Sequence, residues 1–229
     1  MRSIRADEVP GVIRRRSAAI IVTVILMDAV LETYGTADFT AWPVAEPPQD
    51  GILALSGQMS PAEVGTAMAV VFSYAGIPTA PISDLHHLLD RHLAEAETLL
   101  APGGLRVRDT ATNAEILPGC CCGLESWREW RDVLRKQHIW LGHDPDTGLE
   151  YIAGAVRLKQ EPRSPLSPMH EVEIRLDDLP ALLTTVHLRL QGFLGLVGRW
   201  ASETTPRAAD RLVTVFDENF EITGPLELG

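Results

Sequence analysis

The sequence predicts an α+β protein, with helices flanking a mostly antiparallel meander sheet in a single globular domain. Helical patterns come first, short alternating patterns follow, and helical patterns return at the end. The regular strand–helix alternation of a parallel sheet is missing, which favours α+β over α/β. The chain has 229 residues, 45% of them hydrophobic and 22% charged, which is ordinary for a folded protein with a sizeable core.

The N-terminal segment is predicted to be a mobile basic arm at residues 1–16, followed by the domain at 17–229. The arm carries five arginines against Asp7 and Glu8. The apolar run that follows ends at Asp28 and is shorter than the roughly 20 residues of a membrane-spanning helix. We therefore expect a buried element and no membrane association, and residues 18–30 fit a strand or a helix equally well.

Two helices are predicted next. Ser60, Pro61 and Glu63 combine a capping box with a proline at the first helical position, which predicts a helix over residues 61–75. Leucines recur at helical spacing after Ser83, and Pro102 ends this second pattern.

A meander is predicted over residues 105–176. "LRVRD" and "EILPG" form strands around a turn, and "ESWREWRDVLRK" forms a short helix. "IWLG" and "LEYIAGAVRLKQ" predict a hairpin around the turn sequence "HDPDTG", and "HEVEIRL" adds a strand. The proline-rich stretch at 161–169 is interpreted as a loop within one domain, because the meander needs a helical cover.

Helices return after Asp177, which can cap a long helix. The apolar stripe of this helix ends near Trp200. Three glycines inside this helix weaken it by about 1 kcal/mol each relative to alanine, which predicts close backbone packing as compensation. They are Gly192, Gly195 and Gly198. A last helix opens at Thr205 and Pro206, and "FEITGPLEL" predicts a final edge strand.

The only three cysteines are adjacent, at Cys120, Cys121 and Cys122. Adjacent cysteines cannot form a disulfide framework, so we expect a reduced, cytoplasmic setting. The favoured interpretation is packing, in which small side chains fill a tight corner between Gly119 and Gly123.

Two chemical interpretations of the cysteines remain open beside packing. Cys120 and Cys122 would point the same way in an extended segment, and His138 and His143 could complete a zinc site, although the usual spacer between the cysteines is missing. Alternatively, any of the three cysteines could be a catalytic thiol, with His138 or His143 as the base.

Charge points to a protein partner rather than to nucleic acid. The net charge is −11, and residues 17–100 hold ten acidic residues against Arg91. Such acidic segments disfavour nucleic acid and suit a basic protein. The same excess of acid is also the ordinary means by which many proteins stay soluble, and this interpretation stays open beside the partner. The partner-binding residues predicted from these acidic segments are Asp28, Glu32, Asp38, Glu46, Asp50, Asp84, Asp90, Glu95 and Glu97.

The function predicted from these features is a non-enzymatic protein-binding module of the bacterial cytoplasm. Its most concrete version is an immunity or antitoxin-like inhibitor of a basic partner, without a cofactor. Signatures such as GxxxxGK[ST], GxSxG, HExxH and CxxC are absent from the sequence. The alternative is an enzyme or zinc-binding protein that uses Cys120–Cys122.

Overall fold

Two antiparallel sheets form the β part of the protein in a computed structural model, which describes residues 24–34, 36, 39–76, 89, 98–162 and 169–228. The four-stranded sheet has the order β2-β1-β3-β4 and the three-stranded sheet the order β5-β6-β7. The strands are β1 (Ile25–Glu32), β2 (Ile52–Ala54), β3 (Gly103–Asp109), β4 (Glu115–Ile116), β5 (Thr147–Ile152), β6 (Ala155–Gln160) and β7 (His170–Arg175).

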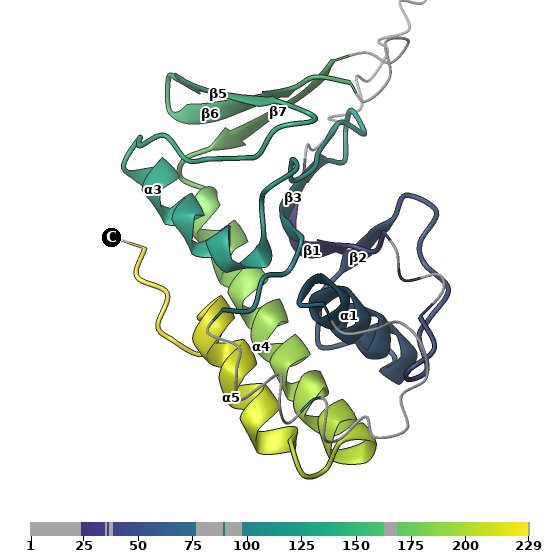
Figure 1. Ribbon diagram of the computed structural model, residues 1–229. Helices are drawn as coiled ribbons and strands as arrows, with labels where there is room; N and C mark the ends of the chain where they lie inside the picture. The colour runs from purple at the N-terminus through teal and green to yellow at the C-terminus, as the bar shows by residue number, and fades with distance from the viewer. Residues whose placement is uncertain are drawn as a thin grey trace, which may run out of the picture.

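The helices cover these sheets and pack on one another. Figure 1 shows α4 running the length of the molecule, with α5 beside it and the three-stranded sheet at one end. The described helices are α1 (Pro61–Tyr74), the 3₁₀ segment η1 (Leu124–Glu129), α3 (Trp130–Leu134), α4 (Leu179–Thr204) and α5 (Ala209–Phe220). The predicted α+β class is confirmed.

The most specific helix prediction is also confirmed. Helix α1 starts at Pro61, and the hydroxyl of Ser60 accepts from the Glu63 N–H while the Glu63 carboxylate accepts from the Ser60 N–H. The predicted mobile arm at 1–16, the second helix after Ser83, apart from Leu89, and most of the 161–169 loop lie outside the described residues. The ambiguous run at 18–30 is described from Val24 on, and its residues 25–30 form the first part of β1.

The predicted hairpin was placed wrongly along the chain. Strand β6 and most of β5 lie inside the segment that was expected to form one strand, and β5 begins two residues earlier, within the predicted turn. The two strands pair from Thr147↔Gln160 to Ile152↔Ala155. The turn between them is Ala153–Gly154, where Gly154 has a φ of 74°. The "IWLG" segment, residues 139–142, forms no strand, and its Leu141 carbonyl accepts from the N–H of Gly119, directly before the cysteines.

Helix α4 buries one stripe of apolar side chains, as predicted. By length and composition alone it could cross a membrane, and within the described residues it is the one helix that could. Its close backbone packing is confirmed at Gly192, where an added Cβ would lie 2.8 Å from the Cα of Gly57. Among the described residues, no atom lies within 4 Å of such a Cβ on Gly195, so the three glycines do not all have a close backbone neighbour there.

The C-terminal segment is not the predicted edge strand. Residues 221–228, all described, form no strand. The guanidinium of Arg128 donates to the carbonyl oxygens of Glu221, Gly224 and Pro225 at 2.7, 2.6 and 2.9 Å. These carbonyls are thereby satisfied by a side chain rather than by a neighbouring strand.

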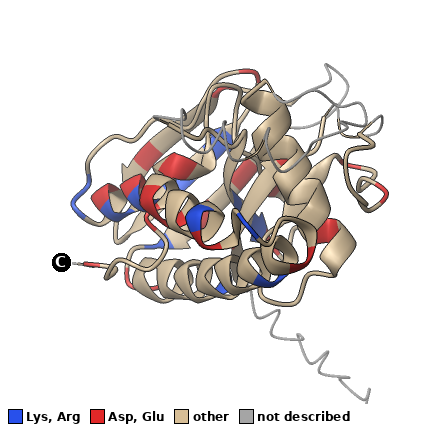
Figure 2. Ribbon diagram, turned by 60° about the horizontal axis from the view of Figure 1, so that its bottom comes forward, with Lys and Arg blue, Asp and Glu red and all other residues tan. Residues whose placement is uncertain are grey.

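The two sheets meet through β4 and share one continuous hydrophobic core. The amide of Gln160, on β6, bonds both ways to the backbone of Leu117: it donates to the carbonyl at 2.7 Å and accepts from the N–H at 3.1 Å. This contact holds the chain just before the cysteines against the second sheet. Figure 2 shows acidic positions on several elements, with basic positions between them.

Candidate functional site

The cysteine loop is fixed by a short antiparallel contact with the segment that precedes β5. Cys120 donates its N–H to the carbonyl of His143 at 2.5 Å, and His143 donates its N–H to the carbonyl of Cys120 at 3.2 Å. Beside this bridge, an added Cβ on Gly142 would lie 2.5 Å from the carbonyl carbon of Gly119. The two glycines therefore allow the two loops to touch, backbone to backbone.

The pairing of the thiols differs from the prediction. Cys121 has a φ of 65°, in the left-handed region that few non-glycine residues adopt. As a result Cys120 and Cys121 lie together, with their sulfurs 3.6 Å apart, while the Cys122 sulfur faces the carbonyl oxygen of Trp140 at 3.9 Å. The expected pair of Cys120 and Cys122 was wrong, because it assumed an extended chain.

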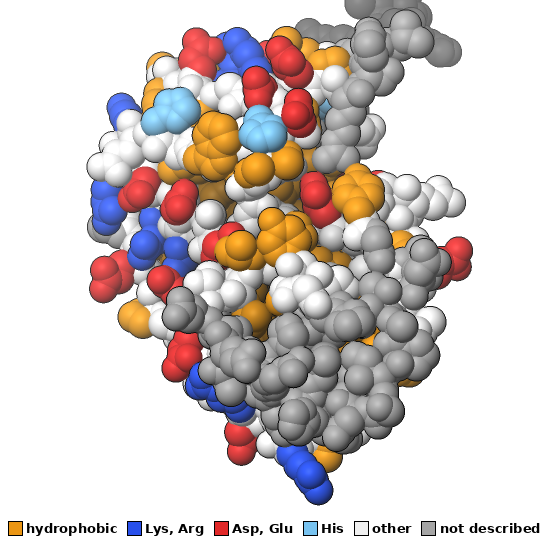
Figure 3. Space-filling view, viewed as in Figure 1, with side chains coloured by type: hydrophobic (Ala, Val, Ile, Leu, Met, Phe, Trp, Pro, Cys, Tyr) orange, Lys and Arg blue, Asp and Glu red, His pale blue; other side chains and the backbone are white. Residues whose placement is uncertain are grey.

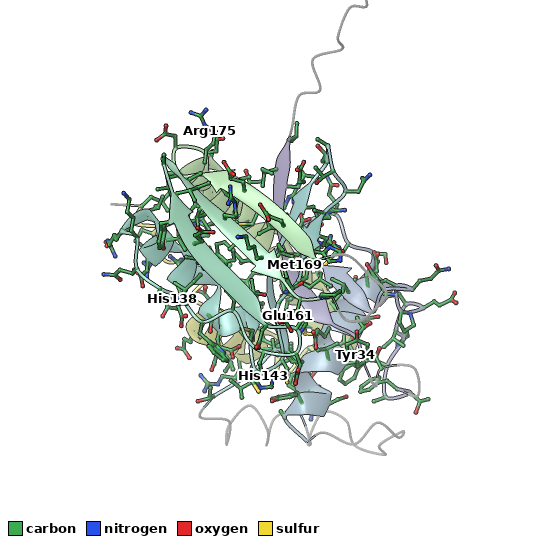
Figure 4. The ribbon with its side chains drawn as sticks, turned by 90° about the horizontal axis from the view of Figure 1, so that it is seen from above. Tyr34, His138, His143, Glu161, Met169 and Arg175 are labelled. Atoms are coloured by element: carbon green, nitrogen blue, oxygen red, sulfur yellow. The ribbon has the colours of Figure 1, made fainter. Side chains whose placement is uncertain are left out.

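Only one of the two predicted histidines reaches the thiols. The Nε2 atom of His143 lies 3.5 Å from the Cys121 sulfur, and its Nδ1 atom lies 3.2 Å from a carboxylate oxygen of Asp144. His138 lies apart from the sulfur atoms in Figure 4, and its Nδ1 bonds the neighbouring Ile139 carbonyl at 3.1 Å. His138 is therefore not part of the cluster.

Three potential ligand atoms thus come together, from Cys120, Cys121 and His143, all within 4.8 Å of one another. Two adjacent thiols beside an imidazole can hold a soft metal ion, and a thiol beside an imidazole can also exchange a proton with it.

Asp144 was not among the predicted site residues. Its place directly after His143 was the sequence signal, but that stretch was interpreted as a hairpin turn.

The thiols differ in acidity. The pKa of Cys120 is raised, chiefly by its side-chain hydrogen bond with Cys121, and burial and the nearby charges add to this. Burial raises the pKa of Cys122 to about 11, and the carboxylates of Glu129 and Glu125 act in the same direction. Cys122 is half-buried, so of the three cysteines it best fits the packing role that was favoured for the whole run.

Cys122 should be slow to alkylate in the folded protein. A pKa of about 11 instead of 9.0 lowers the thiolate population at pH 8. Because the thiolate is the nucleophile, we expect iodoacetamide to modify Cys122 about 100-fold more slowly than in the urea-unfolded chain. Peptide-resolved mass spectrometry after timed quenching measures both rates. Equal rates in the folded and unfolded protein would contradict this assignment.

Cys120 and Cys121 open into a surface depression of about 330 Å³, the cysteine hollow. Besides residues 119–123, it is lined by Glu32, Tyr74, Leu100, Ala101, Pro102 and Glu125. Figure 3 shows hydrophobic and histidine side chains gathered above the middle of this face, around a hollow. Figure 4 places Tyr34 and His143 along the same edge of the molecule.

The rim of the hollow is apolar and exposed. We define the rim as Tyr74, Leu100 and Trp140, which are 61%, 41% and 60% exposed. Trp140 belongs to it because its ring lies edge-on to the imidazole of His143, with centroids 6.4 Å apart. Sequence patterns missed these residues because exposed aromatic side chains give no periodic signal.

The predicted acidic residues are not gathered on one described surface. Asp28 is buried and ion-paired with Arg106, Arg108 and Arg189, which removes it from any partner surface. Glu32 is half-buried in the wall of the cysteine hollow, and Glu46 and Asp50 are exposed elsewhere. The remaining predicted residues lie outside the described part of the chain: Asp38, Asp84, Asp90, Glu95 and Glu97.

Comparisons of the chain with models of protein families, with curated proteins and with solved structures find no match. The function therefore has to follow from the geometry of the site.

Proposed function

We propose that the protein binds a basic segment of another protein in the cysteine hollow. The observation that carries this proposal is that the exposed side chains of Tyr74 and Leu100 line a concave surface, with exposed Trp140 beside it against His143. Exposed apolar side chains that gather in one place mark interaction sites more often than scattered ones do. Tyrosine and tryptophan also supply much of the binding energy in protein interfaces.

The charge of the hollow supports a basic occupant. Glu32 and Glu125 line it, and the whole chain carries a net charge of −11. A lysine or arginine that enters between these carboxylates would also pass the faces of the rim aromatics, which attract cations. An inhibitor of the immunity or antitoxin class, acting on a basic toxin in the bacterial cytoplasm, is the most concrete form of this proposal.

Affinity capture from the native host tests the proposal. The tagged full chain is compared with a rim variant, Tyr74→Ser with Trp140→Ser, and with a control, Leu188→Ser. Leu188 is 63% exposed on α4 and lies outside the rim, so the control removes an apolar side chain of similar fractional exposure from another surface. We expect the same protein to be retained by wild type and control, and lost from the rim variant.

Cross-linking of the captured complex then locates the contact. Cross-links should join a lysine- or arginine-rich segment of the partner to residues beside the hollow, and elution should ease as salt rises, because salt screens exposed charges. Equal retention by the rim variant, or cross-links confined to the outer face of β5–β7, would reject the proposal.

A further inference from the structure

We propose that Cys120, Cys121 and His143 bind one zinc ion, which leaves a fourth coordination position open to the cysteine hollow. This proposal rests only on the ligand cluster, and it holds or fails independently of the protein partner. The ligands come from two loops, one after β4 and one before β5, that the Cys120–His143 backbone bridge already holds together.

The distances in the cluster fit tetrahedral zinc. With Zn–S bonds of about 2.3 Å and Zn–N bonds of about 2.0–2.1 Å, a tetrahedral site separates two sulfurs by about 3.8 Å and a sulfur from a nitrogen by about 3.6 Å. The corresponding distances are 3.6 Å from Cys120 to Cys121 and 3.5 Å from Cys121 to His143. The third separation, between the Cys120 sulfur and the His143 ring nitrogen, is no more than 4.8 Å, so the three atoms can surround a single ion.

The orientation of His143 also suits a metal ligand. Asp144 accepts the Nδ1 hydrogen of His143 at 3.2 Å, which leaves the lone pair of Nε2 directed toward the thiols. A carboxylate on the far nitrogen is the usual outer partner of a zinc-bound histidine, because it fixes the tautomer and the ring orientation. His143 and Asp144 are adjacent in the sequence, so the carboxylate already lies beside the imidazole and the fold does not have to change.

The choice of metal follows from the donors. Two thiolates and an imidazole are soft or borderline ligands that zinc accepts, whereas calcium and magnesium require oxygen ligands. Two thiolates also balance the charge of a divalent ion.

Packing explains Cys122 but not Cys120 and Cys121, which are exposed. A catalytic thiol would need one cysteine beside His143, and the second sulfur at 3.6 Å is what a metal site needs.

The open position has a structural consequence. Zinc sites with three protein ligands normally keep water in the fourth position, in contrast to closed four-ligand structural sites. Because Cys120 and Cys121 line the cysteine hollow, a water on the ion would face that space. An ion there would also join the loop that carries the cysteines to the loop that carries Trp140, and so hold that side of the rim in place.

Metal titration of the full chain tests the site. Protein stripped with chelator and kept reduced with a phosphine is titrated with Zn²⁺ against a chromophoric zinc indicator, and with Co²⁺ as a spectroscopic probe. We expect one zinc per chain and a sulfur-to-cobalt charge-transfer band. Cys121→Ser and His143→Gln should each weaken zinc binding by more than about 100-fold, and Asp144→Asn by about 10-fold, within the range known for outer partners.

Cys122→Ser is the matched control, since it removes a neighbouring thiol that points away from the cluster. It should keep the zinc stoichiometry and the cobalt band of the wild type, while Cys120→Ser and Cys121→Ser each lose about half of the band. Thermal unfolding of the metal-free variants checks that each one folds. Failure of the folded wild type to bind zinc stoichiometrically, or an equal loss in Cys122→Ser, would overturn the proposal. Neither outcome would bear on the capture experiment, which reads out retention of a protein partner by wild type, rim variant and control.

Discussion

Replacement of Asp28 by alanine should lower the free energy of unfolding by about 3 kcal/mol, at the lower end of the cost of breaking a buried ion pair. Asp28 and Arg106 are paired across β1 and β3, and both side chains are 9% exposed. Without Asp28, the ion pair that Arg106 keeps within the described residues is the one with Glu115, at 3.5 Å. Arg108, at 3.1 Å from Asp28, and Arg189, on α4, would face one another without an intervening carboxylate.

Urea unfolding followed by circular dichroism measures this loss. The control is Arg108→Ala, because this side chain is 41% exposed and its ion pair should contribute no more than about 1 kcal/mol. If Asp28→Ala cost less than Arg108→Ala, the arginine cluster would not be held by Asp28.

Replacement of Trp127 by alanine should cost about 3–5 kcal/mol, the range for large aromatic residues in a core. Trp127 is 1% exposed and donates its indole N–H to the Phe220 carbonyl at 2.8 Å. It also packs on His187 of α4, with ring centroids 5.6 Å apart. The variant would therefore open a cavity and leave the last carbonyl of α5 without its donor.

Trp140→Ala is the matched control for this prediction. Trp140 is 60% exposed, so its removal should change the free energy of unfolding by no more than about 0.5 kcal/mol. The two tryptophans therefore separate stability from binding: Trp127 fixes the helices, and Trp140 is free to contact a partner. A similar loss of stability in both variants would argue that the rim is part of the core.

Local signals predicted most of the fold because they act within one element. The capping box of α1 lies within four residues, and the alternation in β7 depends only on strand geometry. The hairpin was misplaced because "HDPDTG" resembles a turn as strongly as the Ala153–Gly154 turn does. Pairing between distant segments favours the hairpin turn at Ala153–Gly154, because β7 pairs with β6 along all six residues.

The candidate site could be predicted only in part. Cys120, Cys121 and His143 were named, because thiols and histidines are few and their chemistry is recognisable. Their pairing depends on the left-handed turn at Cys121 and on the contact between Gly119 and Gly142, which join segments more than 20 residues apart. Asp28 was misjudged for a related reason. Its partner on β3 follows it by 78 residues, so net charge could not reveal its burial.

The affinity of the captured partner for the metal-free chain tests the central claim most directly. Calorimetry should give wild type and Leu188→Ser the same Kd. The rim variant, Tyr74→Ser with Trp140→Ser, should bind at least about 30-fold more weakly, which corresponds to the loss of one interface hot spot of about 2 kcal/mol. A rim variant that binds with the wild-type Kd would contradict the assignment of the cysteine hollow as the partner-binding surface.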